Sequence, residues 1–236
     1  MPRFYVGFLA FLFVVSCVAV QLTLRGRPEV RPINFAPLVF DNQSGLGQSI
    51  PRFPLFLIYQ QNVGMLRNAF QSAQEAFPGQ IVIIDNSEDT ELSRHPDFQD
   101  AAAYYHTVTL LNFPQLMNLL AALSKAWGFD YFGWMHSDGV VLRKDTSEDI
   151  GAIVQSKLQG MSSSSWGVAF TYYDILAFYN TKVVLEHPWD ENYLQNYMAD
   201  CDVYQRWRLA RYSTDKLPGI DKHIQLVHVG SVPEKR

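Results

Sequence analysis

An aspartate stands at the end of an apolar and aromatic run, Phe-Asp-Tyr-Phe-Gly-Trp-Met-His-Ser-Asp-Gly, at residues 129–139. Such a run, stopped by a small polar cluster, predicts a buried β-strand that delivers Asp138 to the rim of a sheet. Ligands of open α/β sheets bind beyond the carboxyl ends of the strands. This carboxylate is therefore placed to hold a metal ion or a phosphate-bearing ligand. The alternative is a turn acid that only precedes Gly139.

Two further carboxylates, Asp200 and Asp202, open a predicted helix at residues 199–211. The helix dipole keeps a carboxylate ionised at this position, so either side chain suits the removal of a proton from a hydroxyl group. A pair of helix caps is the alternative interpretation. Arg206 is spaced to pair with Asp202 across one helical turn or to bind a phosphate.

A third polar group, Asp85, Asn86 and Asp89, follows an apolar run at residues 80–85. The same strand-end rule makes its two acids candidates for ligand contacts. A capped turn is again the alternative.

The elements that would position these residues alternate between strand and helix in the first half of the chain. The patterns predict strands at residues 53–59, 80–85, 107–111 and 129–138, and helices at 62–77 and 112–127. The second helix is the better marked, because Asn112 can cap it, Pro114 suits its first turn and Gly128 can end it. This alternation predicts an α/β fold with a mostly parallel central sheet flanked by helices.

The second half of the chain has a less regular pattern. It predicts a surface helix at residues 145–158, a long strand or a strand pair broken near Tyr173 and Asp174 within 166–179, and partial helix within 181–197. The helix at 199–211 and a last strand at 224–229 follow.

The composition limits the class of protein. With 236 residues, 48% of them hydrophobic, the chain can bury one good core. A net charge of -4 and the absence of a basic stretch disfavour nucleic acid as a partner. The two cysteines, Cys17 and Cys201, provide neither a disulfide framework nor a zinc pattern.

The first residues predict a membrane segment, because residues 4–20 are apolar except for Gly7 and Ser16. We expect residues 1–22 to be a signal anchor or signal peptide, 23–50 a stem or linker, and 51–236 the folded domain. Asn42 begins a glycosylation sequon, which favours a single-pass protein of the Golgi or ER membrane with a lumenal domain, or a secreted protein if the segment is cleaved. The arginines after the segment favour the opposite orientation.

Four motifs, taken in order, resemble those of the GT-A fold glycosyltransferases, particularly the family 2-like group. They are Ile84-Asp85-Asn86-Ser87 with Asp89, the helix start from Asn112 to Asn118, Met135-His136-Ser137-Asp138, and Ala199-Asp200-Cys201-Asp202 with Arg206. A closing His228-Val229-Gly230-Ser231 resembles the C-terminal histidine that completes the metal site in such enzymes. The similarity spans about residues 53–230.

The resemblance implies a Rossmann-like nucleotide-binding half and the transfer of a hexose from a nucleotide-sugar donor to an acceptor, which is a glycan, a lipid or a protein. It implies an inverting reaction, with Asp200 as the base and Asp202 as the acid that follows it. The donor-binding residues implied are Asp85, Asn86, Asp89, Asn118 and Arg206.

The resemblance also implies a divalent cation held by Asp138, His136 and His228. His136 stands where the family carries the first aspartate of its Asp-X-Asp motif, and histidine ligands favour Mn²⁺ over Mg²⁺.

Two other functions fit parts of the pattern. A non-catalytic nucleotide- or sugar-binding protein would keep the fold and carry an inactive His-Ser-Asp site. A dinucleotide-dependent oxidoreductase fits the strand-helix-strand start, but residues 59–64 supply a single glycine where Gly-X-Gly-X-X-Gly is required.

Overall fold

The protein is described here from a computed structural model, which describes residues 52–88, 92, 95–107, 109–161, 165–172, 174–193 and 198–229. The predicted membrane segment, the stem, Asp89 and Gly230 lie outside the described residues. Among the helices that the structure describes, none is long and apolar enough to cross a membrane.

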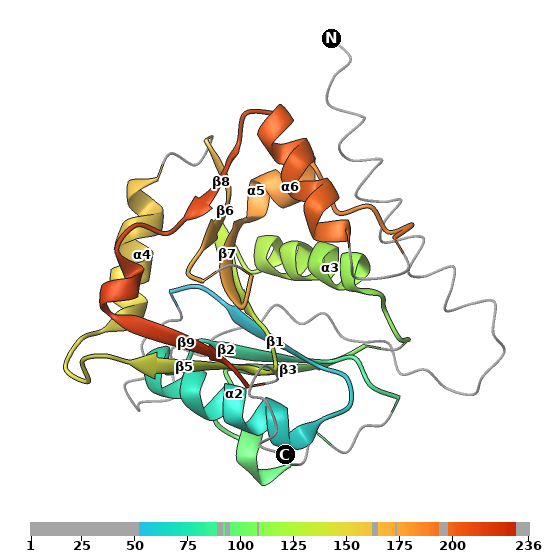
Figure 1. Cartoon of the computed structure of the whole chain (residues 1–236). Helices are drawn as coiled ribbons and strands as arrows, with labels where there is room; N and C mark the ends of the chain where they lie inside the picture. Colours follow the sequence, from blue (N-terminus) through green and yellow to red (C-terminus); the bar gives the residue numbers. More distant parts are fainter. Residues whose placement is uncertain are drawn as a thin grey trace, which may run out of the picture. The chain divides into compact units, whose positions relative to one another are not determined.

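A seven-stranded sheet forms the centre of the described body, with the strand order β3-β2-β1-β4-β7-β6-β8 (Figure 1). Its first four strands in this order are parallel and comprise β1 (Leu55–Tyr59), β2 (Ile81–Asp85), β3 (Ala103–His106) and β4 (Tyr131–Met135). Because they are parallel, their carboxyl ends meet at one edge of the sheet.

The other strands extend the sheet with mixed pairing. β7 (Leu176–Asn180) is antiparallel to both β4 and β6 (Trp166–Phe170), and β8 (Ser213–Lys216) runs parallel to β6. The predicted strand pair within 166–179 is thus confirmed. So is the mostly parallel sheet, since four of its six strand pairings are parallel.

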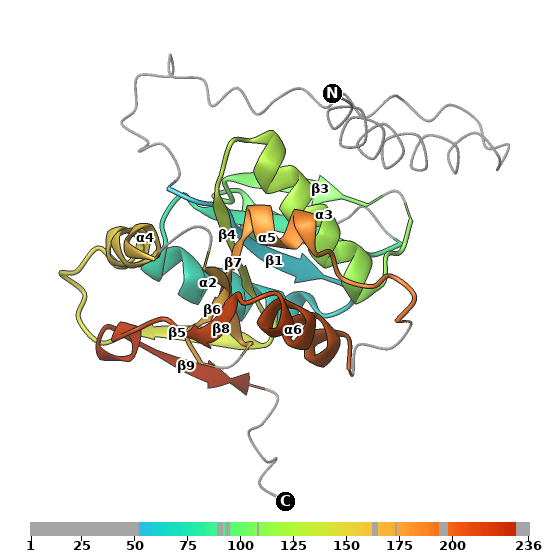
Figure 2. The same cartoon turned by 90° about the horizontal axis from the view of Figure 1, so that it is seen from above.

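Helices cover both faces of the sheet. They are α2 (Val63–Ala76), α3 (Phe113–Ala126), α4 (Ile150–Gly160), α5 (Thr181–Glu186) and α6 (Ala199–Leu209), with short 3₁₀ turns at Pro96–Phe98 and Ile220–Lys222. The buried residues of α2 and α4 belong to one hydrophobic cluster, and those of α3, α5 and α6 to another. Figure 2 shows the ribbons of these five helices around the sheet. Each helix buries an apolar face against the sheet, which explains the periodicity of the sequence.

The helix that leads to β4 forms as its end signals predict. The Asn112 side chain accepts from the Gln115 N–H at 2.9 Å while the Gln115 side chain accepts from the Asn112 N–H at 3.0 Å. This capping box satisfies two of the helix's free amides. Gly128 follows with a φ of 81°, a conformation that glycine adopts at little cost.

Two strands form a separate ribbon beside the sheet. β5 (Gly139–Arg143) pairs antiparallel with β9 (Ile224–His228), so that Gly139 lies opposite His228. β9 was predicted as the last strand, whereas β5 and β8 were not predicted. The Val141 N–H donates to the Ser72 hydroxyl at 3.1 Å and ties the ribbon to α2.

One predicted strand, at residues 107–111, is wrong. The strand instead ends at His106, because the two tyrosines before it pack well there: Tyr105 contacts the ring of Trp127, and Tyr104 donates to Asp85. The backbone of Leu111 is bonded to the side chain of Asn86 and makes no strand pairing.

The predicted helix at 145–158 begins later than expected. Asp145 accepts from the Ser147 N–H at 2.8 Å and makes a turn, and Asp149 then caps α4 by accepting from the Ala152 N–H at 2.9 Å. Aspartate side chains accept hydrogen bonds from nearby backbone N–H groups, which stabilises turns and helix caps rather than the helix interior.

Candidate functional site

A cleft of about 670 Å³ opens at the carboxyl ends of β1 and β4. Its walls come from these strand ends, the first turns of α3 and α6, and the connection between β6 and β7. The lining residues are Ile58, Tyr59, Gln60, Gln61, Asn62, Phe113, Leu116, Trp134, Met135, His136, Ser137, Asp174, Met198, Asp200 and Cys201. This is where ligands of open α/β sheets bind.

Asp138 lies in the tight turn between β4 and β5. The Gly139 N–H donates to the His136 carbonyl at 3.0 Å and closes the turn. A Cβ at position 139 would lie 2.8 Å from Ile175 Cγ2, so the close packing requires glycine there. The Asp138 carbonyl accepts from the Val229 N–H at 2.8 Å, which brings the end of β9 beside the turn.

His136, Asp138 and His228 form the one group of three or more potential metal-ligating residues in the described part of the chain. One ligand atom from each lies within 4.8 Å of the others. His228 Nε2 is 2.9 Å from Asp138 Oδ2, and His136 Nδ1 is 3.4 Å from Asp138 Oδ1. All three side chains are partly buried, so the fold positions them while leaving them accessible.

The charges of the cleft are predominantly acidic. Asp174 and Asp200 line it, and among its described lining residues there is no lysine or arginine. An anionic ligand would therefore need a cation beside it, because buried or half-buried like charges repel strongly.

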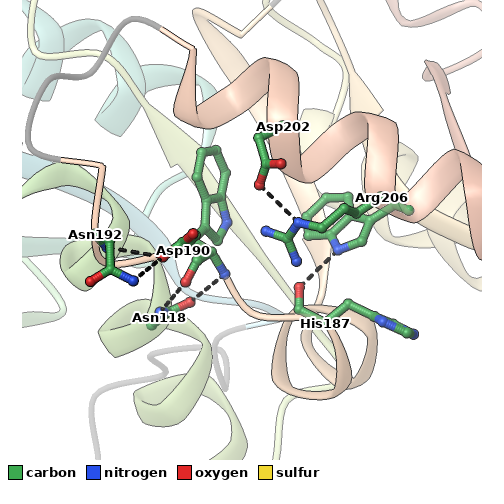
Figure 3. Close-up of polar contacts among 8 residues, drawn as sticks. Asn118, His187, Asp190, Asn192, Asp202 and Arg206 are labelled. Atoms are coloured by element: carbon green, nitrogen blue, oxygen red, sulfur yellow. Dashed lines mark hydrogen bonds and ion pairs between the residues drawn. The ribbon is translucent and has the colours of Figure 1, made fainter.

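The two acids at the start of α6 are placed differently. Asp200 lines the cleft, whereas Asp202 accepts from Arg206 Nε at 2.8 Å (Figure 3). Both acids fall in the first turn of the helix, as predicted. Arg206 likewise makes the ion pair that its spacing allowed and is not among the lining residues.

Buried aromatic residues hold α6 against the sheet. Trp207 Nε1 donates to the His187 carbonyl at 2.9 Å, and the hydroxyls of Tyr179 and Tyr204 are 2.9 Å apart. Burial raises the pKa of Tyr204, and the neighbouring Tyr179 raises it further. Tyr204 therefore stays neutral, and these two contacts hold the middle of α6 against the sheet.

Asp85 and Asn86 are buried beside the cleft rather than in its lining. Asp85 is 0% exposed and accepts from the Ser87 N–H at 3.0 Å, from the Ser87 hydroxyl at 2.6 Å and from Tyr104. Asn86 accepts from both the Leu111 N–H and Thr107 Oγ1 at 2.9 Å. In this structure the pair organises the loop after β2.

Asn118 holds another loop in place. Its Oδ1 accepts from the Trp189 N–H at 2.9 Å, and its Nδ2 donates to the Trp189 carbonyl at 3.0 Å and to Glu191 Oε1 at 2.9 Å. Figure 3 shows Asn118 on α3 below the segment that carries Asp190 and Asn192. The side chain therefore joins α3 to the segment that follows α5.

Asp174 is a residue of the cleft that sequence reasoning missed. It lies between β6 and β7, and its Oδ2 is 3.8 Å from His136 Nε2. The available signal was an acid at the break between two apolar strands, 166–170 and 176–180. Its closeness to His136 depends on the pairing of β7 with β4, which no local pattern reveals.

No known protein family matches the sequence, and no curated protein matches it. The fold is similar to that of several solved nucleotide-sugar transferases. TarS of S. aureus matches with a TM-score of 0.43 and 13% identity, over 61% of this chain and 52% of that one. The mannosyltransferase PcManGT of Pyrobaculum calidifontis, in complex with GDP-Man and Mn²⁺, matches with a TM-score of 0.49 and 8% identity, over 73% and 56%.

A putative nucleotide-diphospho-sugar transferase of Desulfovibrio desulfuricans matches with a TM-score of 0.46 and 13% identity, over 71% of this chain and 81% of that one. The chain spans about half the length of the first two structures. These are likenesses of fold alone.

Proposed function

We propose that the protein is an inverting glycosyltransferase that moves a hexose from a nucleotide-sugar donor to an acceptor hydroxyl, with the help of a divalent cation. The observation that carries the proposal is the grouping of His136, Asp138 and His228, of which His136 lines a cleft at the carboxyl ends of the sheet, with Asp200 on another wall of that cleft. The order of the sequence motifs supports the same function.

The three residues fit a divalent cation by their chemistry. Two imidazole nitrogens and one carboxylate oxygen suit Mn²⁺ better than Mg²⁺, which prefers oxygen ligands. When bound, such an ion would neutralise the charge that grows on the departing nucleoside diphosphate. Lysine or arginine side chains could neutralise the same charge, but the described lining residues of the cleft include neither. The cation is therefore the source of positive charge that the proposal requires.

On the acceptor side, Asp200 would take the proton of the attacking hydroxyl. Asp200 lies in the first turn of α6, and its half-buried position in the cleft wall gives it access to a substrate. Asp202 is committed to Arg206 and would support the helix start rather than take the proton.

The test uses the purified full chain, in detergent where required, with a panel of nucleotide-sugars and Mn²⁺. We expect donor hydrolysis or transfer with at least one donor, and a rise in melting temperature with the matching nucleoside diphosphate and Mn²⁺. If no donor reacts and no nucleoside diphosphate raises the melting temperature, the proposal is wrong. Nucleotide binding that survives chelation, without turnover, would instead support a non-catalytic binding protein.

We also propose, from the sequence, that residues 1–22 anchor the protein in a membrane of the secretory pathway with the folded domain in the lumen. The sequon at Asn42 gives the test, because only a lumenal site receives an N-linked glycan. A mobility shift on glycosidase treatment, lost in Asn42→Gln, is expected. Protease sensitivity of the domain in sealed, right-side-out microsomes would contradict it.

A further inference from the structure

We propose that Asp174 is a positioning residue for His136: its carboxylate accepts the Nε2 proton of the imidazole and so leaves Nδ1 free to face Asp138. The role rests on the proposed metal-assisted function, and it adds a residue that neither the sequence motifs nor the group of metal-ligating side chains contains.

The two nitrogens of His136 face different carboxylates. Nδ1 is 3.4 Å from Asp138 Oδ1, on the side where His228 also approaches. Nε2 is 3.8 Å from Asp174 Oδ2. The imidazole therefore lies between one carboxylate that belongs to the metal-ligating group and one that does not.

The environment of Nε2 calls for a partner. The atom is buried and makes no hydrogen bond within the described structure. A buried donor or acceptor without a partner costs about 1–3 kcal/mol. The distance to Asp174 exceeds a hydrogen bond of about 2.7–3.2 Å by less than 1 Å, which a small rotation of either side chain can close.

The backbone holds the two residues together. The His136 N–H donates to the Ile175 carbonyl at 2.9 Å, which continues the β4–β7 pairing in which Met135 lies opposite Leu176. The Thr171 N–H donates to the Leu176 carbonyl at 3.0 Å and closes the connection between β6 and β7. Asp174, the residue next to Ile175, is thus fixed beside the imidazole and is only 22% exposed.

The chemical consequence follows from the two forms of neutral histidine. Only one ring nitrogen carries a proton, and a carboxylate that binds the proton on Nε2 leaves the lone pair on Nδ1. A carboxylate behind a metal-binding histidine fixes the ring and makes it more basic, and its loss typically lowers metal affinity about 10–100-fold.

The first experiment measures Mn²⁺ affinity of the full chain by electron paramagnetic resonance. We expect Asp174→Ala to weaken Mn²⁺ binding about 10–100-fold and Asp174→Asn, which keeps a neutral acceptor, to weaken it less. Asp215→Ala is the matched control, since this exposed acid of β8 lies outside the cleft lining and should leave the affinity unchanged. Equal affinity of Asp174→Ala and the unsubstituted chain would overturn the role.

The second experiment needs no metal and separates this role from the proposed function. Nitrogen NMR of the metal-free chain should show a proton on Nε2 of His136, and Asp174→Ala should shift the Nε2 signal because this proton loses its carboxylate partner. An Nε2 without a proton, or a signal that Asp174→Ala leaves unchanged, would overturn the proposal. A chain that binds no Mn²⁺ but keeps the Asp174-dependent Nε2 signal would retain the positioning role and refute the metal site alone.

Discussion

Replacing Asn118 with alanine should destabilise the protein by about 2 kcal/mol. The substitution removes the partners of the Trp189 N–H and carbonyl, and each lost bond of this kind costs about 1 kcal/mol net. Loss of the contact with the exposed Glu191 adds little. Alanine regains about 0.5 kcal/mol through its higher helix propensity, which places the expected total between about 1.5 and 2 kcal/mol.

The assay is urea unfolding of the full chain, followed by tryptophan fluorescence. The midpoint should fall at constant slope, and the melting temperature should fall by roughly 4–8 °C for a domain of this size. Asn192→Ala is the matched control, since the side chain of this exposed asparagine donates to the exposed Asp190 and its loss should change stability by less than about 0.5 kcal/mol.

Nucleotide binding decides between the structural role of Asn118 and its predicted contact with the donor. The structure favours a role in holding the segment after α5, so Asn118→Ala should keep nucleoside diphosphate affinity near that of the unsubstituted chain under conditions where it is folded. Unchanged stability together with lost nucleotide binding would refute this reasoning and support donor contact.

Three further substitutions test the cleft and the fold. Asp138→Ala should abolish the stabilisation by Mn²⁺, which at one hundred times the dissociation constant is about 2.7 kcal/mol, or roughly 5–11 °C; a retained shift would exclude this carboxylate as a ligand. Asp200→Asn should lower the turnover rate about 10²–10⁴-fold while donor binding persists, and full activity would assign the base elsewhere. Asp149→Ala should cost about 1 kcal/mol at pH 7 through loss of the α4 cap. The Ala152 N–H and then Arg52 lower the pKa of Asp149, so this stability is present above the unfolded pKa of about 3.9 and is lost as the pH falls through the lower folded value. Urea titrations at pH 7 and pH 3 should show the difference between the two chains shrinking, and a pH-independent difference would contradict the assignment.

Local signals explain which elements could be predicted from the sequence. The helix α3 is specified by its own capping residues, and β1, β2 and β4 are apolar runs that end in polar turns. By contrast, β8 reads Ser-Thr-Asp-Lys, which has no strand pattern, and it forms because β6 offers a free edge. The predicted position of β3, at residues 107–111, was wrong. The strand forms at Ala103–His106 instead because Tyr105 packs against Trp127 and Tyr104 bonds to Asp85, and these contacts cannot be read from the local sequence.

Some features of the candidate site could also be predicted from local sequence, and others could not. The position of Asp138 just beyond a buried strand follows from the sequence, because the polar stop marks the end of the apolar run. The predicted strand at 129–138 was too long, since β4 ends at Met135 and Asp138 lies in the turn that follows. The approach of His228 and Asp174 depends on the β5–β9 and β4–β7 pairings, which join distant segments. The buried state of Asp85 also depends on tertiary contacts, since Tyr104 reaches it from a neighbouring strand.

During synthesis, β4 and the turn with Asp138 leave the ribosome long before β9, because chains emerge from the N-terminal end. The parallel half of the sheet can form while β5 still lacks its partner strand. His228 reaches Asp138 only when β9 pairs with β5, so the site is completed in one of the last steps of folding. A nascent or C-terminally clipped chain would keep most of its core and lack His228, one of the three residues of the proposed cation site.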